Sequence, residues 1–131
     1  MIRKLVYSLS IILICFSCSK TEQKYDNPIF AHFFKELNNK SIDEFNKSYY
    51  PDKSKEVLDV YIPILKDLKN SNFTITSYHK YSGKKLNFDG DTKNIYIVEI
   101  DKEILTTFKI EDNKIQYLIP ICKGNEIIGW I

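Results

Sequence analysis

The side chains that we consider for proton exchange in an enzyme all lie in the second half of this chain. The candidates for such acid–base chemistry are His79, Glu99, Asp101, Tyr78, Tyr96 and Tyr117. A strand can direct groups of this kind into an apolar pocket, where burial raises the pKa of a carboxyl group. Simpler interpretations fit them better, because His79 stands beside Lys80 at a strand end, Asp101 falls in a turn, and tyrosine is a good strand former. We therefore assign no catalytic residue.

Metal-binding and phosphate-binding patterns are also missing from the sequence. His32 and His79 are its only histidines, and it contains neither a CxxC nor an HExxH pair. The segment Asp89-Gly90-Asp91 lacks the further oxygen ligands and the closing Glu of a calcium loop, so it predicts a plain turn. The four glycines are scattered, which excludes a glycine-rich phosphate loop. We expect no metal and no cofactor.

The thiol of Cys18 has a different setting, directly after a short hydrophobic leader. Arg3 and Lys4 form a charged start, residues 5–16 are apolar but too few to span a bilayer as a helix, and Ser17 is small. This layout resembles the precursors of bacterial lipoproteins. The resemblance implies cleavage before Cys18, with lipid on its sulfur and on its new amino terminus. It places the protein in the bacterial cell envelope, anchored to a membrane on the non-cytoplasmic side.

One position departs from the lipoprotein pattern, because Cys15 stands where that family usually has Leu. Cys15 is itself a poor acceptor, since the branched Ile14 precedes it where a small residue is needed. Two other interpretations remain open, an ordinary secretory leader cut elsewhere and an uncleaved N-terminal anchor. With two or more lipid chains on Cys18, attachment would need no basic patch on the protein.

The charge balance and the cysteines narrow the class of protein further. The chain has 19 basic and 17 acidic residues, and loss of Arg3 and Lys4 with the leader leaves 17 of each sign. We therefore expect no nucleic-acid partner, because such proteins gather a basic excess on one face. Once Cys15 is removed and Cys18 modified, Cys122 is left alone, so no internal disulfide can form. Its apolar surroundings favour a small core or sheet residue over a reactive thiol.

The elements that position these side chains form two groups. We divide the chain into a leader at 1–17, a lipidated tether at 18–26 and a single domain at 27–131. Up to residue 70 the apolar residues recur at helical spacing, which predicts helices at 28–37, 42–49 and 54–69. Asn27, Ser41 and Ser54 precede these helices, and Ser41 with Glu44 has capping-box spacing. Pro63 predicts a kink or a break in the third helix.

After residue 72 the period changes from helical to alternating. Strands are predicted from 73 toward 81, around 95–97, at 104–110, at 115–121 and at 126–131, with 86–88 as an extension or a partner of the first. Short polar turns at 101–102 and 111–114 force neighbouring strands to be antiparallel. The predicted fold class is α+β, with two to three N-terminal helices packed on one face of a curved antiparallel meander of four to five strands.

This order of elements resembles the cystatin-like cone and, within it, the nuclear-transport-factor-two-like superfamily. The resemblance covers residues 28–131 and rests on element order and size, without a signature motif. It implies a curved sheet that closes with helices around a cavity used for ligands, for subunit pairing or for catalysis. The QxVxG hairpin of cystatin-type protease inhibitors does not occur in the sequence.

A binding role fits the composition best. Aromatic residues make up 14% of the chain, which is more than a small core must hold and leaves aromatic surface for a partner. The candidate pocket or partner surface comprises Tyr78, His79, Tyr96, Tyr117 and Trp130. We predict a lipid-anchored envelope protein that binds, without catalysis, an envelope protein or a small apolar ligand, with a homodimer as a further candidate. The alternatives are a small isomerase-like or hydrolase-like enzyme in the same cavity and a structural subunit of an envelope assembly.

Overall fold

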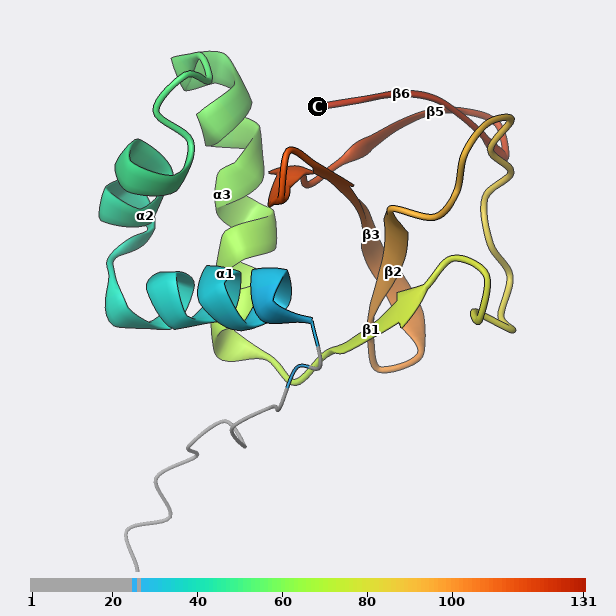
Figure 1. The fold of residues 1–131 in the computed structure, drawn as a ribbon, viewed down its shortest axis with the longest axis horizontal. Helices are drawn as coiled ribbons and strands as arrows, with labels where there is room; N and C mark the ends of the chain where they lie inside the picture. The colour runs from blue at the N-terminus through green and yellow to red at the C-terminus, as the bar shows by residue number, and fades with distance from the viewer. Residues whose placement is uncertain (1–24, 26) are drawn as a thin grey trace, which may run out of the picture.

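A computed structural model describes residue 25 and residues 27–131 of the chain. The predicted leader, Cys18 and the predicted tether other than Tyr25 lie outside the described residues. Three helices come first in this part of the chain, α1 (Pro28–Asn39), α2 (Ile42–Tyr49) and α3 (Lys55–Asn70) (Figure 1). The strands follow as β1 (Thr74–Ser77), β2 (Ile95–Ile100), β3 (Glu103–Glu111), β4 (Lys114–Tyr117), β5 (Pro120–Lys123) and β6 (Glu126–Trp130). The predicted α+β class, with helices before an antiparallel meander, is confirmed.

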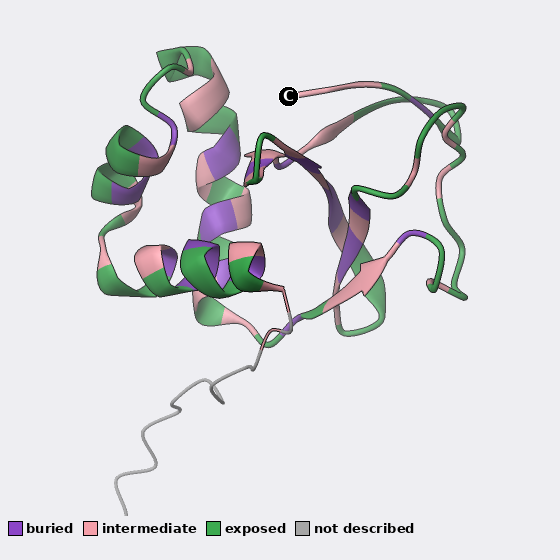
Figure 2. Cartoon of the chain, in the orientation of Figure 1, coloured by how far each residue is buried: buried purple, intermediate pink, exposed green. Residues whose placement is uncertain are grey.

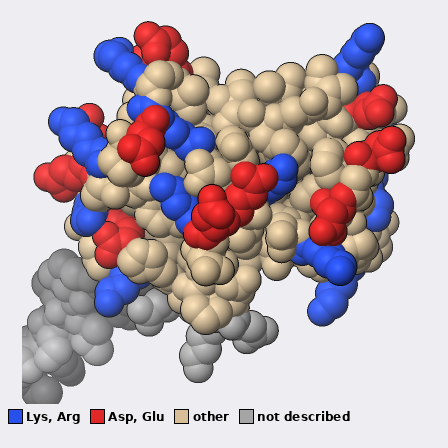
Figure 3. All heavy atoms as spheres, turned by 45° about the horizontal axis from the view of Figure 1, so that its top comes forward, with Lys and Arg blue, Asp and Glu red and all other residues tan. Residues whose placement is uncertain are grey.

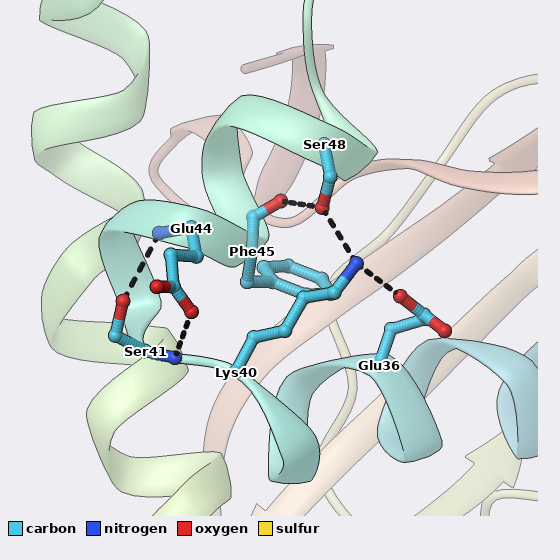
Figure 4. A network of polar contacts seen from close by, with 6 residues as sticks. All are labelled: Glu36, Lys40, Ser41, Glu44, Phe45 and Ser48. Atoms are coloured by element: carbon cyan, nitrogen blue, oxygen red, sulfur yellow. Dashed lines mark hydrogen bonds and ion pairs between the residues drawn. The ribbon is translucent and has the colours of Figure 1, made fainter.

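The helices begin at the predicted capping residues. The side chain of Asn27 accepts a hydrogen bond from the N–H of Ile29, and Pro28 occupies the first turn, where its missing N–H costs nothing. At α2 the capping box is complete, with Glu44 N–H to Ser41 Oγ at 3.2 Å and Ser41 N–H to Glu44 Oε2 at 3.3 Å (Figure 4). Each cap satisfies N–H groups that the helix itself leaves without a partner.

The turn between α1 and α2 is fixed by one lysine. Lys40 Nζ lies 2.5 Å from Glu36 Oε2 and 3.2 Å from Ser48 Oγ, and Ser48 in turn donates to the carbonyl of Phe45 (Figure 4). These contacts join the end of α1 to the last turn of α2. The ring of Phe45 is fully buried and packs edge-on against Phe33 of α1, with ring centroids 5.1 Å apart.

Of the kink or break predicted at Pro63, the break is wrong, because α3 runs as one helix from Lys55 to Asn70. Pro63 is exposed, so its ring meets solvent rather than a packed neighbour. The opposite side of α3 carries Tyr61, Leu65 and Leu68, each fully buried. Packing on both sides of the proline therefore holds the helix together although one backbone hydrogen bond is missing.

The first sheet has the strand order β1-β2-β3-β4, with each strand antiparallel to its neighbour. Two-residue turns close its last two hairpins at the predicted places. Asp101 and Lys102 have φ of 52° and 66°, and Asp112 and Asn113 have φ of 52° and 57°. This left-handed backbone matches the twist of paired strands, and Asp and Asn tolerate it better than most residues.

Three strand predictions need correction. The first strand ends at Ser77 rather than near Tyr81, because the N–H groups of Lys80 and Tyr81 both bond the Ser77 carbonyl and close a turn. Residues 86–88 form only an isolated bridge, Asn87 with Glu126. The strand predicted at 115–121 is split into β4 and β5, and β5 pairs with β6 as a separate hairpin.

The meander carries buried residues that belong to two separate cores. Figure 2 colours the buried positions along its strands. Val98, Phe108 and Ile110 pack with the helices in the larger core. Ile95 and Ile97, which alternate with Val98 along β2, face the other way and pack with Tyr78 in a second, smaller core. The members that complete this second core are Tyr81, Phe88 and Trp130. The loop between β1 and β2 and the β5–β6 hairpin therefore cover the face of the sheet opposite the helices.

Candidate functional site

A cleft of about 590 Å³ opens where the loop after β1 approaches the β2–β3 turn. Its lining residues are Thr76, Lys80, Tyr81, Ser82, Gly83, Lys84, Glu99, Lys102, Glu103 and Ile104. Strands β1, β2 and β3 each contribute to it, so its position is set by the register of the sheet. In size it falls within the range of small-ligand sites.

The floor of the cleft is built around the pair Tyr81 and Glu99. Thr74 stands opposite Glu99 in the β1–β2 register, and Thr76 lies on the same side of β1, so these side chains share one face of the sheet. The turn that ends β1 brings Tyr81 back over this face, and its hydroxyl donates to Glu99 Oε2 at 3.1 Å. Burial raises the pKa of Tyr81, and the hydrogen bond and the charge of Glu99 raise it further. Tyr81 is therefore a neutral donor near neutral pH.

The rim of the cleft carries most of its charge. Lys80 and Lys84 come from the loop after β1, Lys102 comes from the β2–β3 turn, and all three are exposed. Within the described part of the chain none of the three forms an ion pair, whereas Glu99 already accepts from Tyr81. Glu103 is the other carboxylate of the lining. Three ammonium groups are thus available to an incoming anion.

A second group of lysines packs over aromatic rings on the side of the helices. Lys53 Nζ lies 4.5 Å from the ring centroid of Tyr117 and 5.6 Å from those of Tyr50 and Tyr61. Lys114 Nζ lies 5.0 Å from the Tyr50 ring. Burial and the nearby charge of Lys114 lower the pKa of Lys53. These contacts are within cation–π range and are already filled by the protein itself. We interpret this group as a clamp that holds the α2–α3 connection against β4.

Two of the five residues predicted to form a pocket or partner surface lie at the end of β1. The Tyr78 ring is buried in the second core, with Lys85 Nζ 4.3 Å from its centroid. His79 is exposed, and its Nε2 lies 2.8 Å from Thr92 Oγ1, so it joins the two ends of the same loop. Neither residue lines the cleft.

Of the other three predicted residues, only Trp130 joins Tyr78 in the second core. Tyr96 faces the helices, and its ring meets that of Phe30 edge-on at 4.8 Å. Tyr117 lies under Lys53, and Trp130 packs in the second core. Lys109 Nζ is 5.9 Å from the rings of both Tyr117 and Trp130. The five residues therefore do not form one pocket.

The expected surplus of aromatic surface is not found. Every aromatic side chain in residue 25 and residues 27–131 is buried or half-buried, because aromatic residues fill two cores instead of one. The large hydrophobic residues that are exposed in this part of the chain are aliphatic, namely Val60, Ile104, Ile121 and Ile128. Cys122 lies on β5, as the sheet alternative predicted, but its side chain is exposed rather than in the core.

Sequence reasoning found Glu99 but missed the other residues of the cleft. The available signal was a charge asymmetry, since residues 71–88 contain three lysines, Lys80, Lys84 and Lys85, and no Asp or Glu. Pattern analysis could not show that this segment turns back over Glu99. On the face that Figure 3 presents, basic and acidic side chains are interspersed.

Within the described residues no three His, Cys, Asp or Glu side chains approach closely enough to hold a metal ion. None of the helices described is both long and apolar enough to cross a membrane. Comparisons of the chain with protein-family models, with curated proteins and with solved structures found no match.

Proposed function

We propose that this chain is a lipid-anchored binding module of the bacterial cell envelope that takes an anionic group into the cleft around Tyr81 and Glu99. One observation carries the proposal: three lysines without ion-pair partners among the described residues surround a cleft of ligand size. An anion that met Lys80, Lys84 and Lys102 together would gain charge-assisted hydrogen bonds that water supplies less well.

The composition of the lining favours binding over catalysis. Its ionisable side chains are lysine, glutamate and one tyrosine, and His79 and Cys122 stand elsewhere. Burial and Glu99 raise the pKa of Tyr81, which makes its hydroxyl a weaker acid and a poorer source of a nucleophile. The charged rim also favours an anionic ligand over the small apolar ligand that the sequence predicted.

A titration with citrate tests the cleft, because citrate is a small tricarboxylate with as many carboxylates as the lining has lysines. The full-length chain in detergent micelles is followed by the backbone amide signals of residues 76–84 and 99–104. We expect saturable shifts in these segments and a loss of affinity of about tenfold in the double variant Lys80→Gln, Lys84→Gln.

A matched control uses two exposed lysines outside the cleft, Lys66 and Lys123, replaced together by Gln. This control removes the same net charge. Equal losses in the two double variants would mean that citrate responds only to overall charge, and the cleft would then not be a site.

The anchor is a separate part of the proposal and is carried by the setting of Cys18 after its leader. The intact mass of the protein from the membrane fraction should exceed that of the chain from residue 18 by the mass of a lipid group. Cys18→Ala should abolish this increase and the membrane retention, while Cys15→Ala should leave both in place. A soluble, unmodified mature chain in all three cases would refute the anchor.

A further inference from the structure

Strand β1 forms one edge of the four-stranded sheet. Its neighbour is β2, and no other described strand pairs with it. Thr74 is exposed, and the remaining three residues of the strand are half-buried. An edge strand of this kind presents backbone groups that another extended segment can bond.

The hydrogen-bond pattern identifies which backbone groups point outward. The N–H of Tyr78 bonds the carbonyl of Ile95, and in an antiparallel pair the bonded positions alternate along each strand. Thr76 opposite Ile97 and Thr74 opposite Glu99 are therefore the next bonded pairs. The other side of β2 agrees, because the N–H of Ile110 bonds Asn94, which places the even-numbered residues of β2 toward β3.

Ile75 and Ser77 consequently direct their backbone groups away from β2. The Ser77 carbonyl is occupied by the N–H groups of Lys80 and Tyr81. The N–H and carbonyl of Ile75 and the N–H of Ser77 have no partner among the described residues. These three groups alternate with the bonded ones at the spacing that an added antiparallel strand would match.

We infer that an extended acidic segment of an envelope protein adds to this edge as a fifth strand and places its carboxylates in the cleft. The inference rests on the proposed function and names its ligand. Thr76 belongs both to β1 and to the cleft lining, so a strand paired with β1 lies directly beside the cleft.

Charge complementarity selects the occupant. The cleft lining has three lysines, Lys80, Lys84 and Lys102, against two carboxylates, and one of these two, Glu99, already accepts from Tyr81. Alternate side chains of an added strand would face Lys80 and Lys84 on the cleft side, and those between them would lie beside Ile75. Backbone bonds would supply affinity, and the lysines would supply the preference for acidic residues.

Amide hydrogen exchange of the full-length chain in detergent micelles tests this inference with the peptide Ac-TVEVEVT-NH2 as probe. In the free protein the amides of Ile75 and Ser77 should exchange rapidly, and the amide of Thr76, bonded within the sheet, should exchange slowly. With peptide at about 100 times its Kd, exchange at Ile75 and Ser77 should slow by about 100-fold, because it then requires dissociation.

Two control peptides separate the contribution of the backbone hydrogen bonds from that of the charge. Methylation of the three valine nitrogens removes the donors that would face Ile75, and it should weaken binding by at least about tenfold. The peptide Ac-TVKVKVT-NH2 has the same strand propensity with opposite charge and should not bind. Equal binding of the methylated and unmethylated acidic peptides, or unchanged exchange at Ile75 and Ser77, would overturn strand addition.

The outcomes distinguish this inference from the proposed function. Citrate binding at the lysines without peptide protection of Ile75 would support the anion site and refute strand addition. If neither citrate binding nor peptide protection is observed, both proposals are refuted. Concentration-dependent protection of Ile75 and Ser77 without any peptide would identify a second copy of the chain on this edge, and would equally overturn the inference.

Discussion

Tyr50 provides a direct test of how the helical layer is joined to the sheet. Its side chain is 1% exposed, and its hydroxyl donates to the carbonyl of Ile115 in β4. Burial raises the pKa of this hydroxyl well above the usual 10.0, and the neighbouring Tyr49 and Tyr61 raise it further. Tyr50 therefore stays protonated in the folded chain at pH values where it ionises in the unfolded chain.

The sign of the pH effect follows from this difference. A raised pKa in the folded state leaves stability unchanged below the unfolded pKa of 10.0 and lowers it as the pH rises beyond that value. At about pH 11, ionisation of Tyr50 favours the unfolded chain by about 1 kcal/mol. Tyr61, whose pKa burial also raises, acts in the same direction. Lys53 has the opposite effect: burial lowers its pKa in the folded chain, so its contribution to stability rises with pH.

The variant Tyr50→Phe isolates the contribution of one hydroxyl, because Tyr61 and Lys53 are common to both proteins. Near pH 8 it should lower the free energy of unfolding by about 1 to 2 kcal/mol, since the Ile115 carbonyl loses its donor. By about pH 11 this deficit should shrink by about 1 kcal/mol, because the variant has no phenol to ionise at this position.

Urea unfolding of both full-length chains across this pH range, followed by circular dichroism, measures the deficit. Phenolate absorbance of the folded proteins provides an independent check. Parallel pH profiles of the unfolding free energy for wild type and variant would refute the reasoning. So would a phenol that titrates near pH 10 in the folded wild type and is missing from the folded variant. Either result would mean that the Tyr50 hydroxyl reaches water.

Three substitutions test the local arguments by urea unfolding. Phe33→Ala removes a fully buried ring and should cost about 3 to 5 kcal/mol, and a cost below about 1 kcal/mol would contradict its central place in the core. Ser41→Ala removes the acceptor for the Glu44 N–H and should cost about 1 kcal/mol, whereas an unchanged midpoint would mean that water caps α2 equally well. Gly124→Ala meets no atom within 4 Å but forces alanine to a φ of 60°, so it should cost about 1 kcal/mol, and a neutral result would show that the turn relaxes.

Local signals in the sequence were sufficient for the helix starts and for the hairpin turns. Asn27, Ser41 and Ser54 cap the three helices because their side-chain oxygens meet N–H groups only a few residues away. Asp101 and Asp112 likewise turn the chain through their own backbone conformation. Because each of these interactions joins residues close together in the sequence, the residue types themselves indicate them, and the predicted helix starts and hairpin turns were confirmed.

The predictions that failed concern features that depend on contacts between distant segments of the chain. Pro63 does not interrupt α3, because tertiary packing of the residues around it outweighs the lost bond. The split between β4 and β5 follows from the end of the chain, where the N–H groups of Leu118 and Ile119 both bond the Ile131 carbonyl. The cleft depends on a similar return, of Tyr81 over Glu99. No periodicity encodes such pairings, and only the fold brings them together.

The proposed anchor and the proposed binding edge are connected through three aromatic rings. The ring of Tyr25, where the described chain begins, stacks on that of Phe34, with ring centroids 4.8 Å apart. The centroid of the Phe34 ring lies 4.8 Å from that of Phe73, the residue just before β1. If Cys18 carries lipid, the seven peptide units from Cys18 to Tyr25 extend at most about 25 Å. The edge strand would then stay close to the membrane surface, so the acidic segment that it receives would have to be presented there. This favours a partner that is itself held at the membrane over a freely diffusing ligand, because two tethered molecules meet at a high effective concentration.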